Sequence, residues 1–213
     1  MEWLEPKPGE KILDVGCGGG ELSLKIAARG CQVYGIDLSK DSINHANDLA
    51  KKSKITAKFQ VADVLSLPYP DGYFDKIVSS SCLEHFADDI NSLKEMKRVL
   101  KPKGSVVLTT DSYLYLGMGN TGEKHKMLAN VVNYYTADEL KNRLEMSGIK
   151  LMERQYLLKS SVTEFFLRIG IKLSWGNWMY AESLIAYPVC SICERLSRRE
   201  VGYTHIIKAN RID

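Results

Sequence analysis

The stretch Lys11–Gly20, KILDVGCGGG, decides the fold of this chain. A short apolar run ends in a cluster of glycines, and a helix-like run follows at residues 21–29. We therefore predict a strand over residues 11–16 that enters a tight turn and then a helix. Glycines have no Cβ and tolerate positive φ, so a ligand can approach this backbone closely. The free N–H groups at the start of the helix suit an anionic ligand group.

A second predicted strand, residues 32–37, ends on Asp37. An acidic residue about twenty positions after the glycines, at the end of the next strand, suits the two hydroxyls of a ribose. Asp37 could instead cap the helix that starts near Ser39, because Asp and Ser are favoured at cap positions. We favour the ribose role, so the sequence predicts a nucleoside-containing ligand.

The spacing of the glycines distinguishes two classes of nucleoside ligand. A dinucleotide-binding turn reads GxGxxG, and its third glycine lets the helix pack close to the strand. Counted from Gly16, that third position is Glu21, and the pattern here is GxGxG preceded by Asp14. This pattern resembles motif I of the class I S-adenosylmethionine-dependent methyltransferases, D/E-x-G-x-G-x-G.

Three further segments resemble motifs of the same family, in the same order and at its separations. Residues 60–64, QVADV, end a third strand on an acid, and residues 67–81 look like the family's L-P-F-x-D-x-S-F-D-x-V segment before strand four. Residues 99–108 resemble its helix–KPGG–strand five step. The four motifs span residues 11–110, about half of the chain. The resemblance is closest to the type 11, quinone-biosynthesis-like branch.

Predicted strands and helices alternate along the chain, which indicates a parallel sheet covered by helices on both faces. The expected strands are residues 11–16, 32–37, 56–61, 74–81, 105–110 and 149–158, and the expected helices are residues 20–29, 40–52, 88–100 and 137–147. The family resemblance adds a seventh, antiparallel strand at residues 203–209, between strands five and six. We thus expect an α/β, Rossmann-like, doubly wound, mostly parallel seven-stranded sheet in a single methyltransferase domain, residues 1–213.

A helical insertion is expected at residues 159–200, before the last strand. Its apolar and aromatic residues alternate with charged ones, and no uncharged run reaches the roughly 18–20 residues of a membrane span. Three interpretations stay open: a lid over a lipophilic substrate, a surface that touches a membrane, and an ordinary helical subdomain or dimer contact. Only ten residues precede the first strand, so the loop at 111–135 should share the role of a lid.

The resemblance implies S-adenosylmethionine as the methyl donor. Backbone of the glycine turn should surround its methionyl part, together with the end of strand four, and Asp37 should bind its ribose. Leu38 and Val64 should lie against the adenine, and Asp63 should accept a hydrogen bond from the adenine amino group. Asp63 could instead be an ordinary loop acid. The expected cofactor-binding residues are Asp14, Gly16, Cys17, Gly18, Gly20, Asp37, Leu38, Asp63, Val64 and Ser80.

Methyl transfer is a single in-line displacement, which needs alignment of the reacting groups. A base is required only where the acceptor loses a proton during transfer. The candidate groups are His85, His125, Tyr113 and Glu84. His85 is the catalytic candidate because its segment resembles the family's L-x-H after strand four, which faces the substrate, and imidazole moves protons near neutral pH. In the family this histidine also serves as a packing residue.

The composition limits the classes of ligand and the cellular location that we expect for this chain. Hydrophobic content of 45% and charged content of 26% are typical of a soluble globular protein, and a net charge of +3 is too small to indicate nucleic acid. Five scattered cysteines and an acidic, short N-terminus without a secretory signal favour a cytoplasmic location. The CxxC pair Cys190 and Cys193 lacks a second pair, so no metal site is expected.

The expected partner is a small-molecule or lipid-like acceptor, with peripheral membrane contact and the oligomeric state both open. Two other functions remain possible at this level. One is a non-catalytic cofactor-binding partner protein, since no base is obvious. The other is a dinucleotide-dependent oxidoreductase, against which Glu21 stands in place of the third glycine.

Overall fold

The computed structural model describes residues 2–157 and 202–212 of the chain. Its strands are β1 (Lys11–Val15), β2 (Gln32–Asp37), β3 (Lys58–Val61), β4 (Phe74–Ser80), β5 (Leu100–Asp111), β6 (Ile149–Leu157) and β7 (Thr204–Arg211). Its α-helices are α1 (Glu21–Ala27), α2 (Lys40–Ser53), α3 (Asp89–Val99), α4 (Asn120–Ala129) and α5 (Ala137–Met146). Three short 3-10 helices are η1 (Val64–Ser66), η2 (Leu83–His85) and η3 (Tyr113–Met118).

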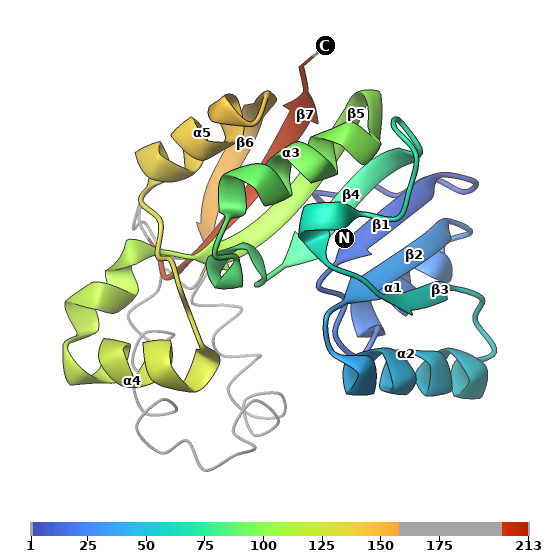
Figure 1. The fold of residues 1–213 in the computed structure, drawn as a ribbon, viewed down its shortest axis with the longest axis horizontal. Coiled ribbons are helices and arrows are strands. Elements are labelled where there is room, and N and C mark those ends of the chain that lie inside the picture. Colours follow the sequence, from blue (N-terminus) through green and yellow to red (C-terminus); the bar gives the residue numbers. More distant parts are fainter. Residues whose placement is uncertain (1, 158–201, 213) are drawn as a thin grey trace.

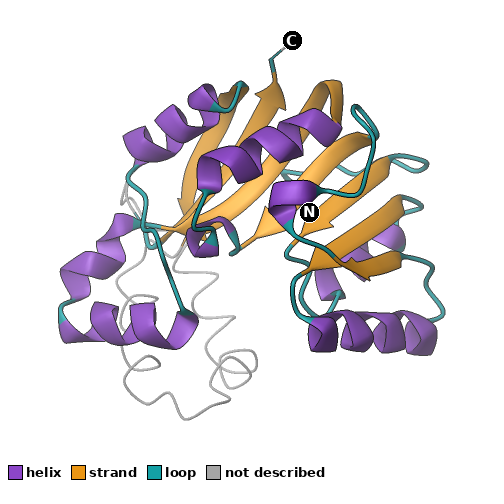
Figure 2. Ribbon diagram, in the orientation of Figure 1, coloured by secondary structure: helices purple, strands orange, loops and turns teal. Residues whose placement is uncertain are grey.

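The seven strands form one sheet in the order β3-β2-β1-β4-β5-β7-β6, with helices on both faces (Figures 1 and 2). Every neighbouring pair among β1 to β5 is parallel, whereas β7 is antiparallel to both β5 and β6. The predicted Rossmann-like fold is therefore confirmed, including the antiparallel last strand between the fifth and sixth. Strand order reverses at β1 and β4, the place where open α/β sheets bind their ligands.

Alternate residues of the central strands face two separate cores. Leu13 of β1 and Ile77 of β4 pack on one face with α3 and α5, whereas the adjacent Ile12 and Val78 pack on the other face with Ile26 of α1. Successive side chains of a strand point to opposite faces, so strands covered on both sides read as nearly continuous apolar runs. This explains why the strand-forming segments were recognisable in the sequence.

The segment after β5 differs from the expected loop at residues 111–135. It forms η3 and α4, so His125 lies on a helix and the loop prediction was wrong. Ser112 starts the segment by accepting the Leu114 N–H, and Asn130 ends α4 in the left-handed conformation that helix C-caps favour. The helix escaped detection because its periodicity is weak: large apolar side chains on its outer surface are exposed.

Other boundaries follow from local capping and pairing. Strand β5 begins five residues before the expected 105, because Leu100 already pairs with Phe74 of β4. The capping box at the start of α5 is formed by Thr136 and Glu139.

Asp75 has a structural role, since it accepts hydrogen bonds from the Lys11 N–H and the Lys101 ammonium.

The predicted insertion at residues 159–200, with Cys190 and Cys193, lies outside the described residues. Within the described ranges, no helix combines the length and the hydropathy that a membrane crossing requires. The same ranges contain no group of three or more His, Cys, Asp or Glu side chains arranged to hold a metal ion.

Candidate functional site

The turn after β1 is shaped by glycines in conformations that other residues adopt rarely. Gly16, Gly18 and Gly20 have φ values of 71°, 51° and 83°. The N–H groups of Gly16 and Cys17 both donate to the Ile36 carbonyl, at 2.9 Å each, so the turn is fixed to the end of β2. A Cβ on Gly16 would lie 2.2 Å from the Cys82 Sγ. Only glycine therefore fits where the turn meets the segment after β4.

Asp14 lies beneath this turn and does not line the cavity beside it. Its carboxylate is buried and accepts the Ser23 hydroxyl at 2.6 Å. Burial, opposed by that hydrogen bond, raises the pKa of Asp14 to about 6. The contact joins β1 to α1, so Asp14 holds the turn in place from below.

Asp37 is held in a fixed orientation at the end of β2. Its Oδ2 accepts the Gly18 N–H at 3.0 Å and its Oδ1 accepts the Ser39 N–H at 2.9 Å. The helix cap itself is Ser39, whose hydroxyl accepts the Ser42 N–H. Each carboxylate oxygen has a second lone pair, so Asp37 can still accept two hydroxyl groups from a ligand in the cavity that it lines.

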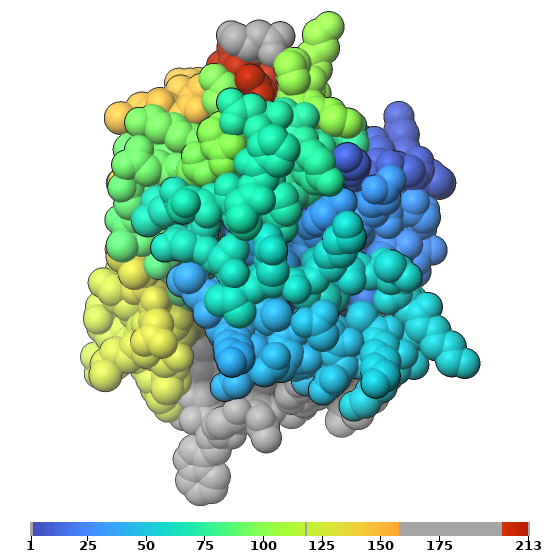
Figure 3. Space-filling model, turned by 45° about the vertical axis from the view of Figure 1, so that its right-hand side comes forward, coloured from blue at the N-terminus to red at the C-terminus, as the bar shows by residue number. Residues whose placement is uncertain are grey.

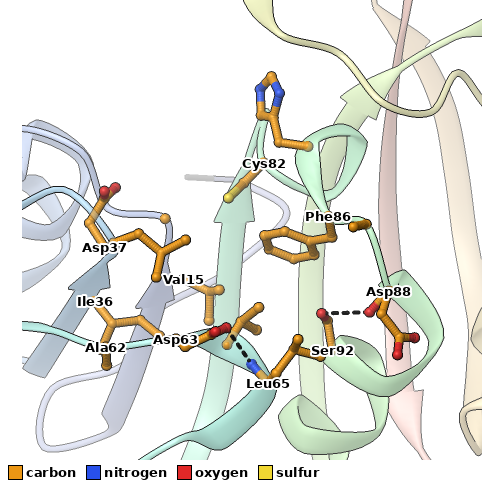
Figure 4. A pocket seen from close by; sticks show the side chains of 15 residues that line it. Val15, Ile36, Asp37, Ala62, Asp63, Leu65, Cys82, Phe86, Asp88 and Ser92 are labelled. Carbon is orange, nitrogen blue, oxygen red and sulfur yellow. Dashed lines mark hydrogen bonds between the residues drawn. The ribbon is translucent and has the colours of Figure 1, made fainter.

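Asp63 follows β3 and lies both at the start of η1 and on the wall of the cavity. Its Oδ1 accepts the Leu65 N–H at 2.9 Å and so caps η1. The same residue lines the cavity, with Val64 next to it. Figure 4 shows Asp37 and Asp63 on the side of the cavity formed by β2 and β3, and Phe86 and Asp88 across from them.

The cavity has a volume of about 370 Å³ and lies at the carboxyl ends of β1, β2 and β4. Most of its wall is apolar, which suits a flat heteroaromatic ring such as a nucleobase. It is lined by Val15, Gly16, Ile36, Asp37, Leu38, Ala62, Asp63, Val64, Leu65, Cys82, His85, Phe86, Ala87, Asp88 and Ser92.

Six of the predicted site residues line this cavity together: Gly16, Asp37, Leu38, Asp63, Val64 and His85. The structure places the other five elsewhere. Cys17 is buried beside β2, and Gly18 meets the site only through its N–H to Asp37. Gly20 packs close to Ala46 and Phe59.

Ser80 turns toward β5 instead of the cavity. Its hydroxyl lies 3.2 Å from that of Thr109, which also accepts the Ser81 N–H. The preceding residue, Ser79, is buried and points toward β1, where its hydroxyl donates to the Val15 carbonyl at 2.9 Å. The alternation of side chains along β4 therefore directs Ser80 away from the ligand end of β1.

Sequence reasoning missed the wall formed by Phe86, Ala87, Asp88 and Ser92. A signal existed, because Asp88 is a typical cap ahead of the apolar face of α3, and its carboxylate accepts the Asn91 N–H. Long-range contacts from the second half of α3 hold this helix against the end of η1. Glu95 accepts the Leu67 N–H at 3.1 Å, and Arg98 donates to the Leu67 carbonyl at 3.0 Å.

His85 of η2 borders the cavity beside Cys82. Its Nδ1 lies 3.1 Å from the Asn130 carbonyl. A carbonyl can only accept a hydrogen bond, so the proton of the neutral ring lies on Nδ1. The lone pair is then on Nε2, the arrangement that a general base requires.

Glu84 of η2 forms a polar cluster with Asp111 and His125. Glu84 is buried and accepts the Thr110 hydroxyl at 2.9 Å, and its backbone carbonyl accepts two N–H groups from residues 132 and 133. Burial, and then the charge of Glu84, raises the pKa of Asp111 to about 8. None of these three groups lines the cavity. The cluster therefore attaches the segment after β5 to η2.

His125 is held on three sides. Its Nε2 lies 3.7 Å from the Asp111 Oδ2, and its Nδ1 lies 2.8 Å from the Tyr134 hydroxyl. The ring stacks on Tyr115 with centroids 4.0 Å apart. Burial lowers the pKa of His125, and Tyr113, the remaining candidate, is exposed away from the cavity. Of the four proposed bases, only His85 borders the cavity.

The chain is similar to known methyltransferases in sequence and in fold. Residues 13–108 match the family model described as a methyltransferase domain. The chain is 36% identical over 108 residues to 27-O-demethylrifamycin SV methyltransferase of Amycolatopsis mediterranei, an alignment that covers 49% of this chain and 40% of the relative. It is 39% identical over 118 residues to the chloroplastic tocopherol O-methyltransferase of Arabidopsis thaliana, over 54% of this chain and 34% of the relative.

The chain thus aligns with well under half of the length of these two relatives. Among solved structures, geranyl diphosphate C-methyltransferase of Streptomyces coelicolor A3(2) shares the fold with a TM-score of 0.76. That match covers 100% of this chain and 78% of the other at 18% identity.

Proposed function

We propose that this chain, which belongs to the class I S-adenosylmethionine-dependent methyltransferases, transfers a methyl group to a small, lipophilic acceptor. The observation that carries the proposal is the cavity at the carboxyl ends of β1, β2 and β4, where the glycine turn, Asp37 and Asp63 come together. The rifamycin and tocopherol methyltransferases among its relatives support a small-molecule acceptor.

The cavity fits S-adenosylmethionine by its chemistry. Its wall is largely apolar, as an adenine needs, and carboxylates stand at separate places on it. We assign the ribose hydroxyls to Asp37, the adenine faces to Leu38 and Val64, and the adenine amino group to Asp63. We place the methionyl part beside Gly16, which has no side chain to block the backbone of the turn.

S-adenosylmethionine supplies a methyl carbon made electrophilic by the adjacent sulfonium. The residues of the chain position it and exclude water. Cys82 and Phe86 belong to a largely apolar wall, and apolar surroundings favour a reaction that removes positive charge. Fixing the donor along the glycine turn leaves the acceptor only one direction of approach, so proximity and alignment provide much of the rate enhancement.

Where the acceptor carries an ionisable hydroxyl or an ammonium group, His85 accepts its proton. The Nδ1–H is held by the Asn130 carbonyl, so Nε2 is free to act as the base. His85 and Cys82 line the same part of the cavity, after β4. This position is separated in the chain from Asp63, which marks the adenine end, and Figure 4 shows Cys82 and Asp63 well apart.

Calorimetric titration with S-adenosylhomocysteine tests the assignment. Asp37→Asn should weaken binding roughly 10–100-fold, the effect of losing charged hydrogen bonds worth about 1.5–3 kcal/mol. The matched control is Asp41→Asn, in the first turn of α2 and outside the cavity. It should bind as the unchanged protein does. Equal affinity in the Asp37 variant, with an unchanged melting temperature, would reject the ribose assignment.

Methyl transfer itself needs a second experiment. Incubation of the chain with S-adenosylmethionine labelled on the methyl group and a lipid extract should yield a labelled product soluble in organic solvent. Cofactor binding without any labelled product would instead support a non-catalytic binding protein. A dinucleotide-dependent enzyme is disfavoured because helix α1 begins at Glu21, where that class has its third glycine.

A further inference from the structure

Residues 130–133, which begin at the C-cap of α4, lie along η2, the short 3-10 helix that carries His85. In the chain, 45 positions separate His85 from Asn130. Figures 1 and 3 show α4, in yellow-green, on the lower left of both views. A helix of a single turn has few hydrogen bonds of its own, so the conformation of η2 depends on the segment that lies beside it.

The backbone on the N-terminal side of His85 is held at both ends of one peptide group. The Glu84 carbonyl accepts the N–H groups of Val132 and Asn133, at 2.9 and 3.0 Å. The His85 N–H belongs to the same planar group and donates to the Cys82 carbonyl at 3.0 Å. Because both lone pairs of the Glu84 carbonyl are used, this peptide group cannot rotate without breaking hydrogen bonds.

On the C-terminal side of His85, a side chain fixes the backbone. The Asn133 Nδ2 donates to the Phe86 carbonyl at 3.0 Å, in half-buried surroundings. Phe86 follows His85 directly, and both residues line the cavity. Asn133 therefore contacts the backbone before His85 through its N–H and the backbone after His85 through its side-chain amide.

The imidazole ring of His85 depends on the same segment. Its Nδ1 donates to the Asn130 carbonyl at 3.1 Å. The length of that hydrogen bond is set by the separation between η2 and residues 130–133, which the Asn133 amide also spans. A movement of Phe86 away from this segment would therefore weaken the bond that keeps the proton on Nδ1.

We propose that Asn133 is a positioning residue for His85. By joining the backbone on both sides of this histidine to the segment after α4, it keeps the imidazole in the tautomer whose Nε2 can accept a proton. The role of His85 as a base is part of the proposed function, and this inference rests on it. The alternative is that Asn133 only satisfies the Phe86 carbonyl and so stabilises the fold.

Nitrogen-15 NMR of the imidazole groups tests the proposal on the full chain. The chain has four histidines, and the signals of His85 are identified by their loss in His85→Gln. At about pH 8.5, where imidazole is neutral, the unchanged protein should show His85 protonated on Nδ1 alone. In Asn133→Ala we expect a mixture of both tautomers. The rate of methyl transfer should fall roughly 10–100-fold for an acceptor that must lose a proton.

Two further variants control the experiment. Asn133→Asp has the same size but cannot donate to the Phe86 carbonyl, so it should reproduce the mixture and gives a second test if the alanine variant unfolds. The matched control is Asn47→Ala, because the Asn47 Nδ2 donates to the Ile43 carbonyl at 2.9 Å within α2, outside the cavity. It also loses one hydrogen bond between an amide and a carbonyl, and the His85 signals and the rate should stay unchanged.

The tautomer of His85 decides between the two roles. A mixture in the Asn133 variants alone supports the proposal. A single Nδ1–H tautomer in both Asn133 variants overturns it, whatever their rates or melting temperatures, as does a mixture in the unchanged protein or an equal change in Asn47→Ala. The proposed function is tested separately by methyl transfer in the unchanged protein. Without any transfer that function fails, while the NMR signals still report whether Asn133 positions the ring.

Discussion

The Nδ1 of His85 donates to the backbone carbonyl of Asn130, 3.1 Å away, and so joins η2 to the C-terminal end of α4. Asn130 is in the left-handed conformation, with φ of 51°. The orientation of the candidate base therefore depends on how α4 ends. Because α4 also carries exposed Met127 and Leu128, a contact that shifts this helix would also shift the base.

Replacing His85 by Gln separates catalysis from cofactor binding. We expect affinity for S-adenosylhomocysteine to change less than about threefold, and the rate of methyl transfer to fall roughly 100–10,000-fold for an acceptor that must lose a proton. The measurement combines calorimetry with transfer of labelled methyl groups to a lipid extract. The matched control is Asn130→Gly, which retains the carbonyl and tolerates positive φ. An unchanged rate in His85→Gln would leave His85 as a packing residue.

Gly16→Ala should destabilise the protein and abolish cofactor binding. The new Cβ would lie 2.2 Å from the Cys82 Sγ, at a backbone φ of 71°. Crowding together with the left-handed conformation costs about 2–4 kcal/mol, measurable by chemical denaturation. Gly9→Ala is the control, since Gly9 has φ of 85° but a Cβ added there would have no atom within 4 Å. A similar loss in both variants would show that backbone conformation alone matters.

Asp88→Ala and Asp88→Ser distinguish the two roles of a cavity residue that also caps α3. Ser retains a side-chain oxygen for the Asn91 N–H, whereas Ala does not. We expect the melting temperature to fall in the Ala variant and to be preserved in the Ser variant. If Asp88 also contacts the cofactor, the affinity of the Ser variant should fall about threefold or more. Unchanged affinity in Asp88→Ser would limit Asp88 to capping.

The sheet could be predicted because local signals agreed with the tertiary structure. Strand β1 is apolar on both faces and runs directly into Gly16, and β4 has buried apolar residues on both faces at Ile77 and Val78. The positions of Asp37 and Asp63 followed from the ends of β2 and β3, since carboxyl ends of parallel strands share one edge. These two positions on the cavity wall could therefore be predicted without knowing how the helices pack.

The other wall depends on contacts between distant segments. Phe86 and Asp88 reach the cavity because Glu95 and Arg98 fix α3 to residue 67, and such pairings are not visible in local patterns. Local sequence patterns also could not show which way the side chains of Asp14 and Ser80 point. Both belong to the expected motifs, but a shift of one residue along a strand reverses the face on which a side chain lies.

Asp111→Asn should change how stability depends on pH. The pKa of Asp111 is raised to about 8 by burial and by Glu84, while the unfolded chain has the ordinary value near 3.8. The folded state therefore binds the proton more tightly. The stabilisation from this group is complete below about pH 4 and is lost as the pH rises through about 8.

Asparagine cannot ionise, so the variant should gain stability relative to the unchanged protein as the pH rises. We expect a relative gain of roughly 1–3 kcal/mol between pH 5 and pH 8.5, discounted for relaxation of the site. Chemical denaturation at both values measures it. Asp14 titrates in this range in both proteins and cancels in the comparison, whereas Glu84 and His125 interact with Asp111, so the difference between the proteins reports the whole cluster around Asp111. A gap that stays constant from pH 5 to 8.5 would mean that Asp111 has an ordinary pKa and that its contacts with α4 are more hydrated than the structure shows.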